Sequence, residues 1–433
     1  MTYEPVTVVG VRAWGVLVGA VTRDPATGFF LFEFDDAWVR RGMELAPLRM
    51  PARRGQFEFP ELSVETYKRL PAMLADSLPD RWGSALVSAR LEQAGVRRED
   101  ITSLDRLAYA ADRAMGALEY FPPILEEAHR ATAIQLSDLV TAARRVIRHE
   151  RDGDQVIAGL RRLIQVGTSA GGIRPKAVIC LNPETGEVRS GQFNAPPGYQ
   201  HWLVKLDGVE DRGDLGIKIS PAAGHGRIEY AYSRMAGACG IEMTECRLLE
   251  EHGRAHFMTR RFDRGGDGTK VHTQTLCALD HLDYNLADTH DYAQLFDVID
   301  RLGLGPEVRE QAFRRVAMNV TGVNRDDHTK NFSFCCGADG SWTLAPAYDL
   351  THAYNPSGRW TQRHQMSVNG KFEGIERADL LELADRFAVP SARRALSEVL
   401  ETVGRWPEYA EEAGVDGATN AEVGRRLAEF RPI

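Results

Sequence analysis

The sequence lacks the features that mark several protein classes. It has only six cysteines among 433 residues and no Cys-x-x-Cys pair, so neither a disulfide framework nor a zinc site of that spacing is indicated. The apolar run over residues 8–21 is interrupted by Arg12 and is too short to span a bilayer. No signal peptide with a cleavage site is recognisable. We therefore expect reduced thiols and a cytoplasmic location without membrane attachment.

Charge and composition narrow the classes further. The net charge of −8 gives no support to general nucleic-acid binding, although a whole-chain sum can hide a local basic face. A content of 43% hydrophobic and 26% charged residues is typical of a folded protein. A chain of 433 residues exceeds one simple core, so two or three subdomains are expected.

The hydrophobic patterns predict an α+β protein whose sheets come mostly before its helices. Residues 1–60 alternate as strands do, and the pattern becomes helical from Leu70. The chain is mostly helical again from Tyr292 onward. Helices are predicted over residues 80–93, 103–115 and 228–238, and from Ser137. Strands are predicted over residues 177–181, 202–206, 245–249 and 255–259.

Residues 323–334 form a dense polar stretch beside a predicted buried strand. Such polar groups are costly to desolvate unless they hold an ion or a substrate. Asp326 and Asn331 have the D-x-x-x-x-N spacing of a protein-kinase catalytic loop, where the Asp accepts the proton of the attacking hydroxyl and the Asn binds magnesium. Asp349 follows at a strand end, where a kinase places its second metal-binding carboxylate. His328 can orient Asp326 or contact phosphate, or it can be purely structural.

A glycine-rich stretch over residues 166–176 lies between a predicted helix and a predicted strand. Its backbone amides can form an anion-binding nest, and Arg174 and Lys176 would add positive charge. It matches neither G-x-x-x-x-G-K-[ST] nor G-x-G-x-x-G, so a flexible turn is the alternative. Lys205 lies within an apolar strand and either faces solvent or binds phosphates, with Glu229 as a candidate partner.

Two further polar groups have competing interpretations. The segment 260–264 can form an adenine hinge, with Phe262 beside the base, or a surface salt-bridge cluster at a domain junction. A second set, His272, Asp280, His281, Asp283 and His290, lacks the spacing of a metal site. We interpret that set as polar surface and helix-capping residues.

Taken together, the motifs resemble the HipA family, the serine/threonine kinase toxins of bacterial type II toxin–antitoxin pairs. The similarity covers nearly the whole chain. It rests on the segments Ser169–Lys176, Val204–Lys205, Arg261–Arg264, Asp326–Ser333 and Tyr348–Leu350, and on residues 70–83. The D-x-H-x-K-N block followed by Tyr-Asp-Leu, together with the Gly-Gly-Ile-Arg-Pro-Lys loop, is specific only as a combination.

The resemblance implies a two-lobed, protein-kinase-like fold with an extra β-rich N-terminal subdomain and a helical C-terminal domain. The implied domains are 1–125, 126–261 and 262–433. The implied catalytic residues are Asp326, Asn331, Asp349 and Lys205, of which Asn331 and Asp349 bind Mg²⁺. The implied ATP-binding residues are Gly171, Gly172, Ile173, Arg174, Pro175, Lys176, Lys205, Arg260, Arg261, Phe262, His328, Tyr348 and Asp349.

The resemblance also implies regulation and partners. Autophosphorylation at Ser169 would place negative charge where the ATP phosphates bind, and so inactivate the kinase. A small helix-turn-helix antitoxin similar to HipB is the implied partner, with DNA reached only through that complex, and a protein is the implied substrate. Two alternatives remain: a small-molecule or lipid kinase with the same ATP site, and a non-enzymatic module that acts as a corepressor.

Overall fold

The computed structural model divides the chain into two compact units, which are described here one at a time. The first comprises Met1–Ala223, Leu249–Thr273 and Cys336–Gly340; the second comprises Gly224–Leu248, Gln274–Cys335 and Ser341–Ile433. The structure describes residues 6–79, 81–93, 95–124, 176–191, 195, 197–207, 210–211, 217–218, 224–251 and 254–432. The helix predicted from Ser137 lies outside the described residues.

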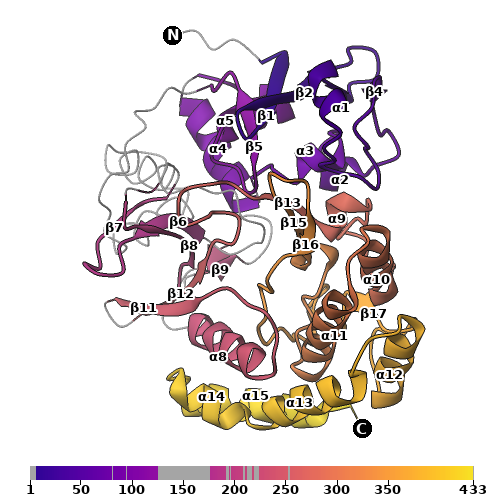
Figure 1. Ribbon diagram of the computed structural model, residues 1–433. Helices are drawn as coiled ribbons and strands as arrows, with labels where there is room; N and C mark the ends of the chain where they lie inside the picture. The colour runs from indigo at the N-terminus through magenta and orange to yellow at the C-terminus, as the bar shows by residue number, and fades with distance from the viewer. Residues whose placement is uncertain are drawn as a thin grey trace. The chain divides into compact units, whose positions relative to one another are not determined.

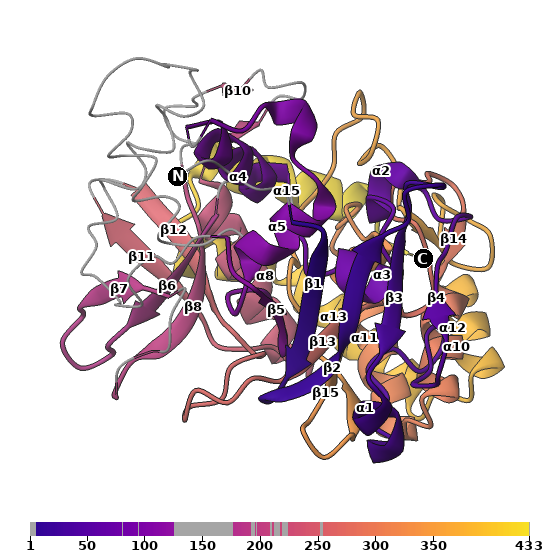
Figure 2. The same ribbon diagram turned by 90° about the horizontal axis from the view of Figure 1, so that it is seen from above.

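The N-terminal part of the first unit is an antiparallel sheet of order β4-β3-β2-β1-β5. Its strands are β1 (Val8–Ala13), β2 (Val16–Arg23), β3 (Phe30–Phe34), β4 (Gln56–Phe57) and β5 (Leu118–Phe121). Buried and exposed residues alternate along β1 and β3, as expected for a sheet with one covered face. Figure 2 shows the five strands side by side, with β4 and β5 at the edges.

Short helices accompany this sheet. They are α1 (Asp36–Arg41), α2 (Val64–Tyr67), α3 (Ala72–Ala75), α4 (Arg81–Gln93), the 3₁₀ turn η1 (Arg98–Asp100) and α5 (Ser103–Ala110). A capping box between Thr102 and Asp105 starts α5. This helix ends at Ala110 and not at residue 115 as predicted, because Ala111 has a φ of +47° and breaks the helical path.

The first unit also contains a second antiparallel sheet, of order β11-β12-β8-β6-β7. Its strands are β6 (Lys176–Leu181), β7 (Val188–Ser190), β8 (Gln200–Lys205), β11 (Cys246–Glu251) and β12 (Arg254–Arg260), and a separate pair joins β9 (Glu210–Asp211) to β10 (Ile217–Lys218). Every residue of β6 is buried, which explains why its sequence is a continuous apolar run after Lys176. The four strands predicted in this part of the sequence are confirmed within two residues.

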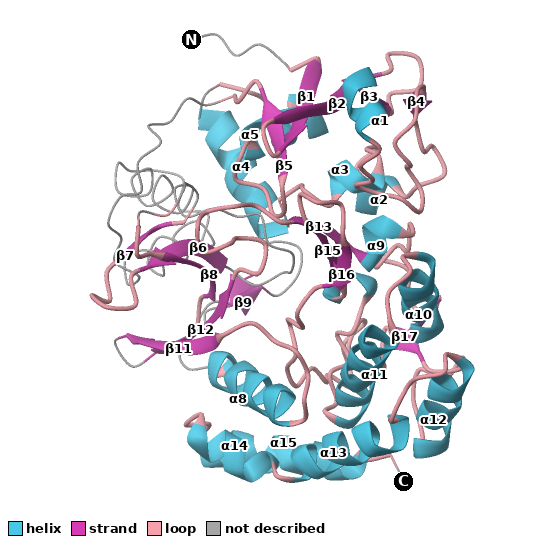
Figure 3. Ribbon diagram, in the orientation of Figure 1, coloured by secondary structure: helices cyan, strands magenta, loops and turns pink. Residues whose placement is uncertain are grey.

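The second unit is mostly helical (Figure 3). Its helices are α8 (His225–Ala238), α9 (Leu276–Leu279), α10 (Tyr292–Arg301), α11 (Pro306–Thr321), η2 (Thr329–Asn331), α12 (Arg377–Arg386), α13 (Ala392–Gly404), α14 (Trp406–Glu412) and α15 (Gly417–Glu429). Its strands form a sheet of order β13-β15-β16 (His272–Thr275, Ser333–Cys336, Trp342–Leu344) and a parallel pair, β14 (His290–Asp291) with β17 (Met366–Ser367).

Helix α11 forms the core of the second unit. It begins with Pro306 at a favoured position, and every residue from Ala312 to Thr321 is buried. It packs against α10 and α13, while α8 packs against α14 through Tyr232 and Trp406, whose ring centroids are 5.6 Å apart (Figure 1). Because the end of α11 is buried all round, its polar residues must find partners inside the protein.

The predicted α+β class, with a sheet-rich first part and a helical C-terminal part, is confirmed. Among the described residues, none of the helices is both long enough and apolar enough to cross a membrane. All six cysteines are free thiols, and only Cys246 is not buried.

Candidate functional site

The segment with the kinase-like spacing follows directly after α11. The helix ends at Thr321, and Val323 then takes a φ of +52°, which is strained for a β-branched residue. Asn324 pairs with Ala353 in a parallel bridge, and the Arg325 amide donates to the Ala353 carbonyl at 3.0 Å. The chain is thereby turned sharply out of the core helix and fixed at the point where the candidate site residues begin.

Asp326 and Asn331 lie on one short loop of the second unit. Asp326 is exposed, and the Nδ2 of Asn331 donates to the Asp326 carbonyl at 2.6 Å. Since that hydrogen bond occupies the amide nitrogen, it fixes the orientation of the amide and leaves Oδ1 of Asn331 as a possible metal ligand. The loop thus presents a carboxylate and an amide oxygen from residues five positions apart.

Asp349 lies on a neighbouring loop of the same unit, and several hydrogen bonds hold that loop to the first. The Tyr348 hydroxyl donates to the Lys330 carbonyl at 2.7 Å and lies 2.5 Å from the Ser333 hydroxyl. The Nδ2 of Asn324 donates to the Asp349 carbonyl at 3.3 Å. Tyr348, an ATP-binding candidate from the sequence, therefore joins the two loops through its hydroxyl.

His328 and Lys330 both lie near the ring of Tyr284, a residue that the sequence did not single out. The imidazole centroid is 5.4 Å from the Tyr284 centroid, and the ammonium of Lys330 lies 4.9 Å above the same ring. Nε2 of His328 is 3.9 Å from Asp326. Its Nδ1 is buried without a hydrogen-bond partner among the described residues. His328 therefore lies close to Asp326 without a hydrogen bond to it, and its Nδ1 is a buried polar atom.

In the first unit, Lys176 and Lys205 occupy opposite positions on β6 and β8. Directly opposite residues of an antiparallel pair point to the same face, so two ammonium groups share this side of the sheet. Lys176 is 4% exposed, and Lys205 lies 5.8 Å from the ring of Phe257 on β12. Two cations beside an aromatic ring are suited to a polyanion such as a triphosphate.

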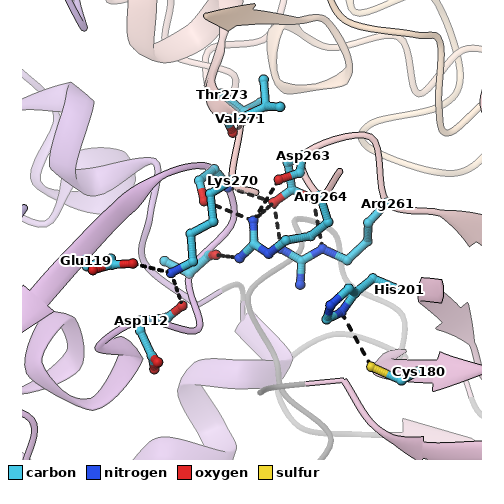
Figure 4. Close-up of polar contacts among 12 residues, drawn as sticks. Asp112, Glu119, Cys180, His201, Arg261, Asp263, Arg264, Lys270, Val271 and Thr273 are labelled. Carbon is cyan, nitrogen blue, oxygen red and sulfur yellow. Dashed lines mark hydrogen bonds and ion pairs between the residues drawn. The ribbon is translucent and has the colours of Figure 1, made fainter. Parts of the chain in front are cut away.

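The segment 260–264, proposed from sequence as a hinge, contains a buried ion cluster (Figure 4). Asp263 is 0% exposed and accepts from Nε and Nη2 of Arg261 at 2.8 and 2.6 Å, and from Nη1 of Arg264 at 2.7 Å. The backbone amide of Gly116 also donates to Asp263, at 2.8 Å. Arg264 in turn donates to the carbonyls of Ala114 and Gly116. The surface-cluster interpretation is wrong, because these side chains lie in the interior.

Electrostatics explain why this cluster is stable in its charged form. Burial alone would raise the pKa of Asp263, but the charges of Arg261 and Arg264 outweigh it and lower that pKa below its usual range. Burial lowers the pKa of Arg264 to about 10. Nearby, burial lowers the pKa of His201 to about 4 and raises that of Cys180 to about 12, although Sγ and Nδ1 are 3.6 Å apart. That pair is therefore neutral, and the thiol is unreactive.

The remaining sequence candidates are either buried or outside the described residues. His272 and His290 were interpreted as surface or capping residues, and this is wrong: they are 1% and 6% exposed and bind the carbonyls of Leu45 and Asp283, which satisfies buried polar groups. Glu229 is buried on α8. Gly171, Gly172, Ile173, Arg174, Pro175 and the autophosphorylation candidate Ser169 lie outside the described residues.

Sequence reasoning missed Tyr292 and Asn319, and it assigned no role to Asn324 and Asp327, although both lie in the polar stretch 323–334. Asp327, Tyr292, Asn319 and Asn324 are all buried and bonded to one another. The only signal in the sequence was the density of polar residues at 323–334, since nothing linked that stretch to positions 292 and 319.

The donor set fits magnesium better than a transition metal. Asp349 and Asn331 offer hard oxygen atoms, and Mg²⁺ is commonly held by one or two protein groups, with phosphate oxygens and water completing its shell. In the described part of the chain, no three His, Cys, Asp or Glu residues gather as a metal-binding cluster. Asn331 and Asp349 are the candidate side chains for holding magnesium.

Comparison with known proteins assigns the chain to a family. The HipA N-terminal domain matches residues 9–121, and the HipA-like C-terminal domain matches residues 168–406. The chain belongs to the HipA family. No curated protein matches it.

Solved structures support the fold. The Shewanella oneidensis MR-1 toxin–antitoxin complex of HipA, HipB and operator DNA contains a chain that is similar at a TM-score of 0.67 and 16% identity, over 98% of this chain and 96% of that one. Helicobacter pylori CtkA, a proinflammatory kinase, matches 53% of this chain and 91% of its own at 11% identity; its TM-score of 0.31 is too low to support an argument. The predicted HipA-type, kinase-like α+β fold is confirmed by the first similarity and the family matches.

Proposed function

We propose that this protein is an ATP- and Mg²⁺-dependent serine/threonine protein kinase that acts as the toxin of a HipA-type toxin–antitoxin pair. The observation that carries the proposal is the connection of two loops in the second unit: Asn331 is bonded to the Asp326 backbone, and Asn324 to the Asp349 backbone. A proton acceptor and two oxygen ligands are thereby held on adjoining loops, as phosphoryl transfer requires.

The proposed reaction assigns one role to each side chain. A protein hydroxyl attacks the γ-phosphorus of ATP, its proton passes to the Asp326 carboxylate, and the bond to the β-phosphate oxygen breaks to release ADP. Asn331 and Asp349 would hold magnesium, which neutralises the developing phosphate charge when bound. Asp326 suits the role of base because it is exposed and has His328 beside it.

The lysine pair supports ATP as the phosphate donor. Lys176 and Lys205 put two positive charges on one face of a sheet, next to Phe257. Two ammonium groups on one face can both contact a bound polyphosphate. In this proposal Arg260 and Phe262 contact adenine, and the Gly171–Lys176 loop covers the phosphates.

The family and its solved relative suggest the cellular partners. We propose that the chain binds a small helix-turn-helix antitoxin similar to HipB in the cytoplasm, and reaches operator DNA through that complex. The S. oneidensis assembly contains those components. Autophosphorylation at Ser169 would restrain the kinase by placing a phosphate against the nucleotide phosphates.

Transfer of ³²P from [γ-³²P]ATP to the protein, with magnesium, tests the proposal, and mass spectrometry then locates the phosphate. Wild type should become labelled at Ser169, whereas Asp326→Asn should lose at least about 100-fold in rate, as expected for a lost catalytic base. Asp297→Asn, an exposed site on α10, is the matched control and should retain activity. Equal labelling of Asp326→Asn and wild type would remove Asp326 from the reaction.

A further inference from the structure

A chain of buried side-chain hydrogen bonds runs beneath the two functional loops. The Tyr292 hydroxyl donates to Asp327 at 2.6 Å and accepts from Nδ2 of Asn319 at 3.0 Å. The Oδ1 of Asn319 accepts from Nδ2 of Asn324 at 2.9 Å, and the same nitrogen reaches the Asp349 carbonyl at 3.3 Å. One end of the chain is thus adjacent in sequence to the proposed base, and the other end is the backbone of a proposed metal ligand.

The Asp327 carboxylate determines which group donates and which accepts in each of these hydrogen bonds. The Asp327 carboxylate also accepts from Nδ1 of His364 and from the backbone amide of Gln365, both at 2.7 Å. A carboxylate can only accept, so the Tyr292 hydroxyl must donate to it and must itself accept from the Asn319 amide. That orientation turns the Asn319 oxygen toward Asn324. A single arrangement is therefore available, and each bond polarises the next.

Packing alone does not explain these residues. Tyr292 and Asp327 are 0% exposed, and Asn319 and Asn324 are 2% exposed. Apolar side chains of similar size would fill that interior without the cost of desolvating polar groups. Two positions next to these hydrogen bonds have a strained, left-handed backbone, since Val323 and Asp349 have φ values of +52° and +53°. Strain of this kind persists only where the surroundings enforce it.

We propose that Asn319 is a positioning residue for phosphoryl transfer, which holds the Asp349 loop in register with the Asp326 loop. The inference rests on the proposed kinase function and extends it to a residue on α11 that contacts no reacting atom itself. Its consequence is specific. Loss of these buried hydrogen bonds should displace the Asp349 loop and weaken magnesium binding. The proposed nucleotide-binding sheet of the first unit should keep its structure.

The test measures the initial rate of phosphate transfer from ATP as a function of magnesium concentration, using the full-length protein. Asn319→Leu removes both links at the centre of the chain, and Tyr292→Phe removes a single oxygen and leaves the ring in place. Tyr232→Phe is the matched control: Tyr232 is equally buried in the same unit, and its hydroxyl bonds the Gly322 carbonyl at 2.5 Å outside the chain. Circular dichroism confirms that each variant is folded.

Asn319→Leu and Tyr292→Phe should both need at least about fivefold more magnesium for half-maximal rate. Their maximal rate should fall about tenfold or more, as expected when reacting groups are misplaced. Tyr232→Phe should match wild type in its magnesium dependence. An active wild type together with chain variants that behave like Tyr232→Phe would overturn the inference and leave the kinase assignment intact. A wild type without transfer would overturn both. If Asn319→Leu does not fold, Tyr292→Phe decides.

Discussion

Replacing Asp263 with asparagine should destabilise the first unit strongly, although the change is nearly isosteric. Asp263 is fully buried, and its carboxylate is the counter-ion of both Arg261 and Arg264. Oδ2 accepts from three donors, on Arg261, Arg264 and Gly116, while Oδ1 accepts from Nε of Arg261. In the variant an amide NH₂ must replace one of these oxygens and face a guanidinium donor.

The magnitude follows from what remains after the substitution. Two buried guanidinium groups lose their counter-ion, and removing one partner of a buried pair typically costs about 3–5 kcal/mol. The bonds from Arg264 to the carbonyls of Ala114 and Gly116 persist, but they carry no compensating charge. With a slope of about 1–3 kcal/mol per molar urea, a loss of that size should lower the midpoint of urea unfolding of the first unit by at least about 1 M.

Urea unfolding followed by circular dichroism measures the effect, and the chain offers a matched control. Asp36 and Arg54 form the same two-bond arrangement, at 2.9 and 3.1 Å, with both side chains more than half exposed. Asp36→Asn should therefore change stability little, because exposed ion pairs are weak. If Asp263→Asn lowers the free energy of unfolding no more than Asp36→Asn does, burial does not strengthen the contribution of this cluster to stability, and the prediction is refuted.

The same cluster gives a pH prediction with a definite sign. The pKa of Asp263 is lower in the folded protein than its ordinary value of about 3.9, so its contribution is fully present above that pH and is lost as pH falls toward the folded pKa. The stability difference between wild type and Asp263→Asn should thus be constant from pH 5 to 7, and should shrink below about pH 4. A difference that grew on acidification would contradict the sign.

Three further outcomes are expected. Gly116→Ala should destabilise by about 1–2 kcal/mol in thermal unfolding, because Gly116 has a φ of +79° and an added Cβ would lie 3.0 Å from the Thr273 amide nitrogen; unchanged stability would show that the loop adjusts. Iodoacetamide at pH 8 should modify Cys246 before Cys180, because burial raises the pKa of Cys180 to about 12. Mass spectrometry of the modified peptides measures the order, and earlier modification of Cys180 would contradict the prediction. Lys205→Met should weaken ATP binding about tenfold or more in calorimetry, and equal affinity would exclude it from the phosphate site.

The local geometry of the candidate loops could be predicted from the sequence better than the side chains that support them. Asp326 and Asn331 are only five positions apart in the sequence. The structure places both on one loop, where the Asn331 side chain donates to the Asp326 carbonyl. The role of Asp327 could not be predicted, because its partners Tyr292 and His364 lie 35 and 37 positions away and are brought together only by tertiary packing. Adjacent aspartates in one motif thus differ completely: Asp326 is exposed and Asp327 is buried.

The fold shows the same division between local and distant causes. Strands such as β6 and β8 were predictable because their apolar runs are continuous or nearly so. The early end of α5 was not, since the turn at Ala111 lets the chain enter β5, which pairs with β1 more than a hundred residues earlier. Burial of the charged segment 261–264 was also hidden, because its partners at 114–116 are distant in sequence.

The left-handed backbone at Asp349 determines which substitution can remove its carboxylate without disturbing the loop. Asparagine enters this conformation more readily than most other residues with a side chain, whereas alanine or glutamine would have to be forced into it. An Asp349→Asn protein should therefore keep the loop and lose only the negative charge. Tests of the proposed binding of an antitoxin and of nucleotide are better made with Asp349→Asn than with an alanine variant.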